Sequence, residues 1–252
     1  MVSHDIVHIV VVPPNTIDAD IVRGVAGIIE KEAYDTRLLL AGQIPRIVAS
    51  QQDVAGSQLI SQRLNDLGLT TFVYKDSDLR RPAQCFIAHT LQFYGNRMVF
   101  CDRDGYTTVL ESKSVLLILT GRFQGSIDTE TTKTKRKFSV AGTVMTGGIP
   151  IWKNVKEKTT DVVITSECFV RIYDGESPET CVEIIENEMD YSFLGEAMAP
   201  TAFVNFKTVV KILRESLPHA VFDDRLTKPL AEGDFEASCK LIYHEIELAQ
   251  VG

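Results

Sequence analysis

Residues 1–78 alternate between extended and helical patterns, and this order restricts the fold more than any other feature of the sequence. Residues 5–13 form a β-branched run stopped by two prolines, which is typical of a strand buried on both faces. Asp18 and Asp53 offer N-caps to the helical stretches that follow them. The patterns predict a βααβαβ module, with strands over 5–13, 44–50 and 70–75 and helices over 18–31, 33–41 and 53–67.

Two short motifs in this module carry a resemblance to a known family. Val22, Arg23 and Gly24 form a V-R-G motif in the first helix, and a K-E-A-x-D motif starts at Lys31 before the second helix. With the element order, these motifs resemble the C-terminal domain of the bacterial ribosomal stalk protein, and the adaptor of the Clp protease is similar in fold. The resemblance covers residues 1–78 and implies a domain that docks onto a protein or peptide partner.

The first helix and the loop before it are the expected binding surface for this partner. Asp20 and Tyr34 stand where the stalk family has lysines, and residues 13–15 are Pro-Pro-Asn where the Clp adaptor has Asn-Asp-Asp. The identity of the partner therefore stays open. The residues expected to bind it are Asn15, Asp18, Arg23, Lys31 and Tyr34.

A polar stretch over residues 75–84 separates this module from the rest of the chain. Charged residues and Pro82 replace the periodic pattern there, as in an exposed linker. We therefore expect three parts, which are a stalk-like α/β domain over 1–78, a strand-rich domain over 84–230 and a helical tail over 231–252.

The strand-rich part shows a period near two, which predicts short antiparallel strands. Asp104 and Gly105 form a dipeptide common in hairpin turns. An apolar stripe from Phe203 to Leu217 predicts a helix that ends at Pro218, and a last helix is expected over 235–248. The expected strands cover 88–94, 97–101, 106–110, 115–120, 138–145, 161–165, 168–174 and 180–186.

These elements predict an α+β chain whose second part is a small antiparallel barrel closed by a helix. The arrangement is similar in topology to pleckstrin-homology-like domains, although no motif carries that similarity. Residues 124–137 hold almost no apolar side chains, so we expect a mobile loop there. The glycine-rich stretch 146–150 is expected to form a turn.

Composition excludes several classes of function. The 26 Lys and Arg against 34 Asp and Glu leave a net charge of -8, which is the wrong sign for binding nucleic acid through overall charge. No apolar run approaches the roughly 20 residues of a membrane span, and no basic segment precedes an apolar one at the start. We therefore expect a cytoplasmic protein without a membrane span.

The five cysteines are odd in number and form no C-x-x-C pair, so we expect buried, reduced thiols and neither a disulfide framework nor a zinc site. His8 lies in the first strand and is expected to be a core imidazole with its polar atoms satisfied. The acidic residues Glu183, Glu186, Glu188 and Asp190 are expected to form a solvated edge. No phosphate-binding loop or other cofactor motif is present, so no cofactor is expected.

The sequence leaves three functions open, and it leaves the oligomeric state open as well. The first is a non-catalytic, adaptor-like protein that binds a protein or peptide partner. The second is an enzyme with a site between the two modules, in which Cys85 or Cys101 is the nucleophile and His89 its base. The third is a module that binds an anionic ligand through the basic run Lys133, Lys135, Arg136 and Lys137.

Overall fold

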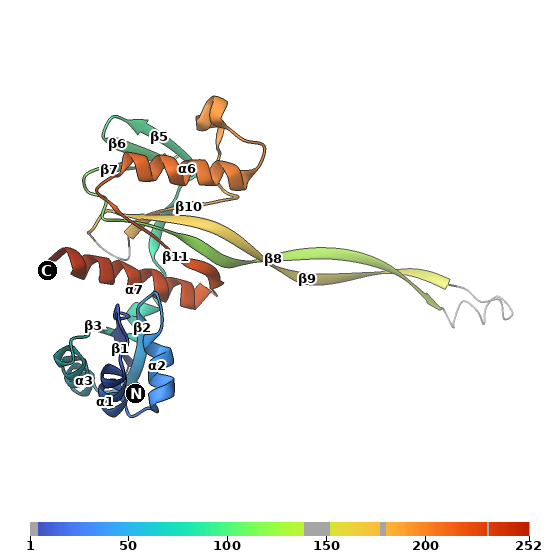
Figure 1. The fold of residues 1–252 in the computed structure, drawn as a ribbon. Helices are drawn as coiled ribbons and strands as arrows, with labels where there is room; N and C mark the ends of the chain where they lie inside the picture. Colours follow the sequence, from blue (N-terminus) through green and yellow to red (C-terminus); the bar gives the residue numbers. More distant parts are fainter. Residues whose placement is uncertain (1–4, 139–151, 177–179, 231, 252) are drawn as a thin grey trace. The chain divides into compact units, whose positions relative to one another are not determined.

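The computed structural model describes residues 5–138, 152–176, 180–230 and 232–251. The chain divides into two compact units, the larger formed by Met1–Phe123 with Glu167–Gly252 and the smaller by Gln124–Ser166. Helices and strands both contribute large shares of the larger unit, which confirms the α+β class (Figure 1).

The first module has the predicted order of elements. Asp18 and Asp53 cap α1 and α3, because their carboxylates accept hydrogen bonds from backbone N–H groups of the first helical turn. Strand β1 is central and pairs antiparallel with both neighbours, in the order β2-β1-β3. The elements are β1 (Val7–Val11), α1 (Ala19–Ile29), α2 (Ala33–Leu40), β2 (Arg46–Gln51), α3 (Val54–Asp66) and β3 (Thr71–Lys75).

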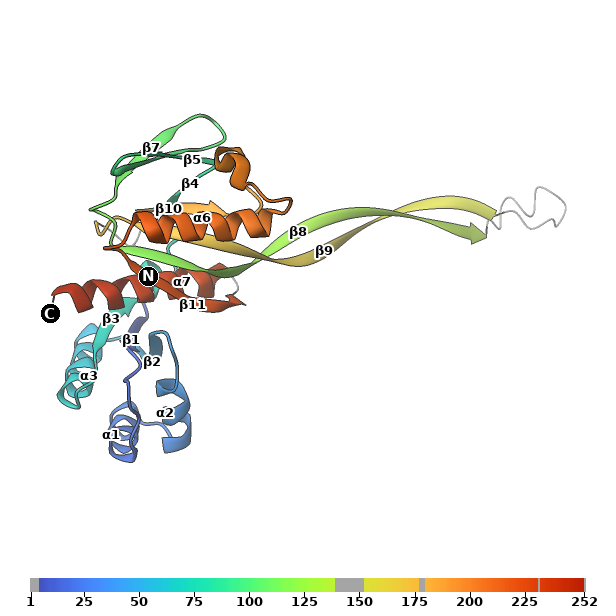
Figure 2. The ribbon, with the colours of Figure 1, turned by 45° about the horizontal axis from the view of Figure 1, so that its top comes forward.

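Every residue of β1 is buried, as the sequence pattern predicts for a strand covered on both faces. Ile9 and Val11 pack against α1 and α3, whereas Val10 points to the other face and packs against Leu241. Leu241 belongs to α7 (Glu232–Val251). The helix expected as a tail therefore covers the second face of this sheet (Figure 1, Figure 2).

The segment expected as an exposed linker is partly helical. Residues Asp76–Leu79 form α4, and Leu79 is buried in the same cluster as Val10 and Leu241. Lys240 of α7 donates a hydrogen bond to the carbonyl oxygen of Asp78 at 2.6 Å. One buried cluster thus contains residues of the first module, of the expected boundary and of the expected tail, and the proposed division into domains stays a prediction.

The remaining strands form two sheets within the described residues. A three-stranded antiparallel sheet has the order β5-β6-β7, and a five-stranded sheet has the order β11-β8-β9-β10-β4. The strands are β4 (Gln84–Ile87), β5 (Thr90–Tyr94), β6 (Arg97–Cys101), β7 (Thr107–Glu111), β8 (Leu117–Phe138), β9 (Trp152–Tyr173), β10 (Thr180–Ile185) and β11 (Val221–Leu230).

The five-stranded sheet is mixed, so the expectation of purely antiparallel strands is wrong. Strand β4 pairs parallel with β10, and β11 pairs parallel with β8. Parallel neighbours need long crossover connections. The sequence gives no periodicity from which these distant pairings could be inferred, and neither β4 nor β11 was among the predicted strands.

The predicted mobile loop over 124–137 is also wrong, because these residues belong to β8. Strand β8 lies beside β9, and pairing between strands satisfies the backbone of a segment that has few apolar side chains. Threonine, which is frequent in this segment, also favours extended structure. The strands expected over 161–165 and 168–174 are one continuous strand, whereas 139–145 and the turn expected over 146–150 lie outside the described residues.

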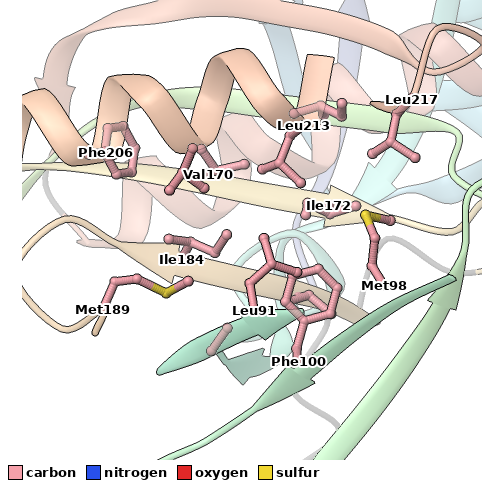
Figure 3. Close-up of a cluster of buried hydrophobic side chains, with 14 of the residues drawn as sticks. Leu91, Met98, Phe100, Val170, Ile172, Ile184, Met189, Phe206, Leu213 and Leu217 are labelled. Atoms are coloured by element: carbon pink, nitrogen blue, oxygen red, sulfur yellow. The ribbon is translucent and has the colours of Figure 1, made fainter. Parts of the chain in front are cut away.

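The largest core lies where α6 (Ala202–Ser216) packs on the sheets. The Thr201 side chain caps α6 by accepting a hydrogen bond from the Val204 N–H, and a short 3-10 helix, η1 (Ser192–Ala197), precedes α6. Figure 3 shows Phe206 and Leu213 of α6 against Val170 of β9, with Leu91 and Phe100 of the three-stranded sheet nearby. No helix in the described ranges is both long enough and apolar enough to cross a membrane.

Candidate functional site

A groove lies where α1 ends beside β2. It encloses about 560 Å³. Strand β2 is an edge of the three-stranded sheet, so one side of its backbone has no neighbouring strand within that sheet. The groove is lined by Ile28, Ile29, Glu30 and Lys31 at the end of α1, by Ile47, Val48, Ala49, Ser50 and Gln51 of β2, and by Ile60 of α3.

Local sequence shapes both walls of this groove. Glu30 ends α1 in the left-handed region, with φ 55° and ψ 45°, which turns the chain away from the helix axis. On the other wall, the pairing of β1 with β2 shifts register between Ile9 and Val10, opposite Ala49 and Ile47. Such a bulge increases the local twist of a strand and re-aims its side chains.

The chemistry of the groove is mixed. Ile28, Ile29 and Ile60 give it an apolar wall, while Glu30 and Lys31 place one charge of each sign beside it. An unpaired strand edge can accept the backbone of an extended peptide, and neighbouring pockets then select its side chains. The arrangement is therefore suited to an extended peptide with alternating apolar side chains.

Only one of the five residues predicted to bind a partner near the first helix lines this groove, and that residue is Lys31. Asn15 instead lines a separate cavity with Pro13 and Arg225. Asp18 accepts a hydrogen bond from the Ile21 N–H at 2.7 Å as a helix cap.

The other two predicted residues lie elsewhere on the helices. Arg23 pairs with Asp20, one helical turn away, at 2.5 Å. Tyr34 is 73% exposed on α2. The structure thus does not gather the predicted residues into one site, and the groove depends on β2, a contribution that sequence reasoning missed.

The four basic residues predicted to bind an anion are all in β8. Lys133, Lys135, Arg136 and Lys137 lie within five consecutive positions of this strand. They fall in the smaller unit, 124–166, which has seven Lys and Arg against four Asp and Glu. The rest of the chain has 19 Lys and Arg against 30 Asp and Glu. The basic run is thus part of a locally cationic unit of an acidic protein.

The prediction of five reduced thiols is wrong, because Cys85 and Cys181 form a disulfide. These residues face each other directly in the parallel pairing of β4 with β10. Their distance in sequence, 96 residues, hides this contact from any spacing argument. Cys85 in this bond has no thiol, so it cannot be the nucleophile of the predicted Cys–His enzyme site.

Among the described residues, no hydrogen bond joins the His89 ring to the thiol of a remaining cysteine. Burial raises the pKa of Cys168 to about 11 and that of Cys239 to about 12, which keeps both thiols protonated and unreactive. The half-buried thiol of Cys101 contacts the carbonyl oxygen of Asp102 at 3.4 Å. His89 donates from Nδ1 to the carbonyl oxygen of Glu188 at 2.6 Å.

His8 is a satisfied core imidazole, as predicted. Its Nδ1 lies 2.8 Å from Ser50 Oγ, and its Nε2 lies 2.8 Å from Asp76 Oδ1. The hydrogen bonds from His8 and Arg80 lower the pKa of the Asp76 carboxyl. The ring therefore links β1, β2 and the start of α4, and its role is structural.

A buried ion-pair network contradicts the expected solvated acidic edge at one position. Glu183 is only 8% exposed and accepts a hydrogen bond from Arg171 Nε at 2.7 Å. Arg171 also donates to both carboxylate oxygens of Glu236 in α7, at 2.9 and 2.6 Å. Burial opposes the charge of Arg171, but the hydrogen bonds to Glu236 and the nearby Glu183 charge leave its pKa above the usual value. This network fixes α7 to the five-stranded sheet.

No group of three or more His, Cys, Asp or Glu side chains suited to a metal ion occurs in the part of the chain that the structure describes. Comparison of the chain with family models, curated proteins and solved structures finds no match.

Proposed function

We propose that this protein is a non-catalytic, adaptor-like protein that binds an extended peptide segment of a protein partner. The observation that carries the proposal is the groove beside the edge strand β2, which places a strand edge next to the side chains of Ile28, Ile29 and Ile60. The peptide would add as a fourth strand next to β2, with its apolar side chains against Ile28 and Ile60.

Two further points support this proposal. The resemblance of residues 1–78 to the stalk C-terminal domain implies docking onto proteins, although it names no partner for this chain. Strand β2 has six residues, so it can pair with a segment of about that length. Main-chain hydrogen bonds would supply affinity and tolerate many sequences, as an adaptor requires.

The test is selection of random peptides displayed on phage against the full chain. Enriched peptides are expected to slow hydrogen exchange of the amides of residues 46–51, because the added strand protects them. The Lys31→Glu variant reverses a charge at the groove and should weaken binding about tenfold, a loss of about 1.4 kcal/mol.

Arg23→Glu is the matched control, since Arg23 is on α1 but does not line the groove. It should leave the peptide affinity unchanged. Equal affinity for Lys31→Glu and the wild type, exchange protection elsewhere, or no enriched peptide at all would each refute the proposal.

A second candidate function, binding of a polyanion by the smaller unit, is favoured by the charge distribution. This unit contains seven cationic against four anionic residues, and β8 holds four of the cationic residues within positions 133–137. A local cationic surface can bind a polyanion although the whole chain carries a charge of -8.

The only tryptophan of the chain, Trp152, begins β9 in this unit and provides a fluorescence signal for the test. Polyphosphate should change this signal with an affinity that falls steeply as salt is added. Replacing Lys133, Lys135 and Lys137 by Gln should abolish the response, whereas Lys31→Glu should not affect it. A response that survives the triple replacement would contradict this second function.

A further inference from the structure

A second cavity, of about 400 Å³, lies between α6 and three strands of the five-stranded sheet. Phe203, Phe206 and Val210 of α6 and Phe222 of β11 form its apolar walls. Phe203 remains 37% exposed, so a large aromatic side chain is still open to solvent at this position. Pockets of this size that combine apolar walls with a few polar groups are typical of small-molecule sites.

Two cationic residues line the same cavity. Arg122 comes from β8 and Lys207 from α6. The Lys207 Nζ lies 4.3 Å from the centre of the Phe203 ring, which keeps this charge beside the apolar wall. Among the residues that the structure describes, no carboxylate forms an ion pair with either cation.

The other polar groups of the lining leave a positive balance. Cys168 lines the cavity as a neutral thiol, because burial raises its pKa to about 11. Asp224 contributes one carboxylate against the two cations. A single anionic group on a ligand would therefore balance the charge of the lining.

We propose that this cavity binds a small apolar carboxylate, with the hydrocarbon part against Phe203, Phe206 and Val210 and the carboxylate near Arg122 and Lys207. The apolar walls alone would accept any hydrocarbon chain. The cations add a preference for an anionic head group, because charge-assisted hydrogen bonds to a carboxylate are stronger than those to a neutral hydroxyl. This ligand site is separate from the groove beside β2 and does not depend on the peptide-binding proposal.

The test uses three probes with the same ten-carbon chain, namely decanoate, decan-1-ol and decyltrimethylammonium, in calorimetric titrations of the full chain at low ionic strength. Decanoate should bind about tenfold more tightly than decan-1-ol. Decyltrimethylammonium should bind most weakly, because its charge repels Arg122 and Lys207. The preference for decanoate should decrease as salt is added.

Two variants separate the roles of the charges and of the apolar walls. The double variant Arg122→Gln with Lys207→Gln should lower the affinity for decanoate to that for decan-1-ol and leave the alcohol affinity unchanged. Phe203→Ala should weaken both ligands alike, because it removes part of the shared apolar wall. Lys211→Gln is the matched control, since Lys211 lies one turn further along α6 and pairs with Glu215 at 3.8 Å.

Equal affinities for decanoate and decan-1-ol in the wild type would overturn the proposal, as would a double variant that still prefers decanoate. Absence of binding by all three probes would also overturn it. Circular dichroism of each variant identifies any that fails to fold, and the comparison of the three probes on the wild type decides the question without variants.

Discussion

The disulfide between Cys85 and Cys181 gives the sharpest test of the structure. It joins β4 to β10 and closes a loop with a sequence separation of 96 residues. The chain-entropy relation for a loop of that length gives about 16 cal/mol/K, or about 4.7 kcal/mol at room temperature. Replacing both cysteines by alanine should therefore lower the free energy of unfolding by about 3–5 kcal/mol.

Urea unfolding followed by circular dichroism measures this loss with and without a phosphine reductant. Reduction should bring the wild type to the level of the double variant, whereas the double variant should not respond. Cys101→Ala is the control, because Cys101 is a free, half-buried cysteine, and it should change stability by less than about 1 kcal/mol.

Thiol titration of the unreduced, denatured protein gives an independent result. Three of the five cysteines should react. Five reactive thiols, or identical unfolding midpoints with and without reductant, would refute the reasoning. The same titration on protein trapped in cells tests the cytoplasmic prediction, since stable disulfides are rare in the reducing cytosol.

Three further predictions concern stability and are measured by denaturant or thermal unfolding. Gly121→Ala should destabilise the protein by about 1–3 kcal/mol, because the added Cβ would lie 2.4 Å from the backbone oxygen of Leu226. Gly27→Ala should instead stabilise the protein by about 0.5–1 kcal/mol, because its added Cβ would meet no atom within 4 Å and alanine favours the helix. Glu30→Gly should raise stability by about 0.5–1 kcal/mol, since φ 55° costs glycine less, and an unchanged or lower midpoint would contradict this. Burial lowers the pKa of His244 below 6.5, so the neutral ring's contribution to folding stability should be complete above pH 6.5 and be lost as pH falls through the lower folded pKa. His244→Gln should flatten this dependence of the free energy of unfolding on pH. An equal slope in both proteins would exclude His244 as the source of the dependence.

Local sequence was sufficient to predict the first module. The β-branched run over 5–13, the caps Asp18 and Asp53, and the apolar spacing of the helices act over a few residues, so they can be read without knowing the fold. The same holds for α6, where Thr201 and an apolar stripe define the helix. His8 was interpreted correctly because a polar residue in a fully buried strand must find hydrogen-bond partners.

The candidate sites could not be predicted in this way. The groove beside β2 is lined by residues of α1, β2 and α3, and the cavity at α6 is lined by Arg122 and Phe222 from strands far apart in sequence. The helical stripe identified Phe203 and Phe206 as apolar positions but could not show that Phe203 stays exposed. The polar groups that line an apolar cavity are brought there by pairing between strands distant in sequence. Local periodicity carries no information about such pairing.

The sequence by itself determined the α+β class, the order of elements over residues 1–78 and the amphipathic helix α6, because each depends on backbone preferences and on side-chain spacing within one element. Only the tertiary structure decided the parallel pairings of β4 and β11, the disulfide between Cys85 and Cys181, and the burial of α7 between two sheets. The physical reason is that these contacts join residues distant along the chain, and many alternative partners satisfy the same local pattern until the whole core packs.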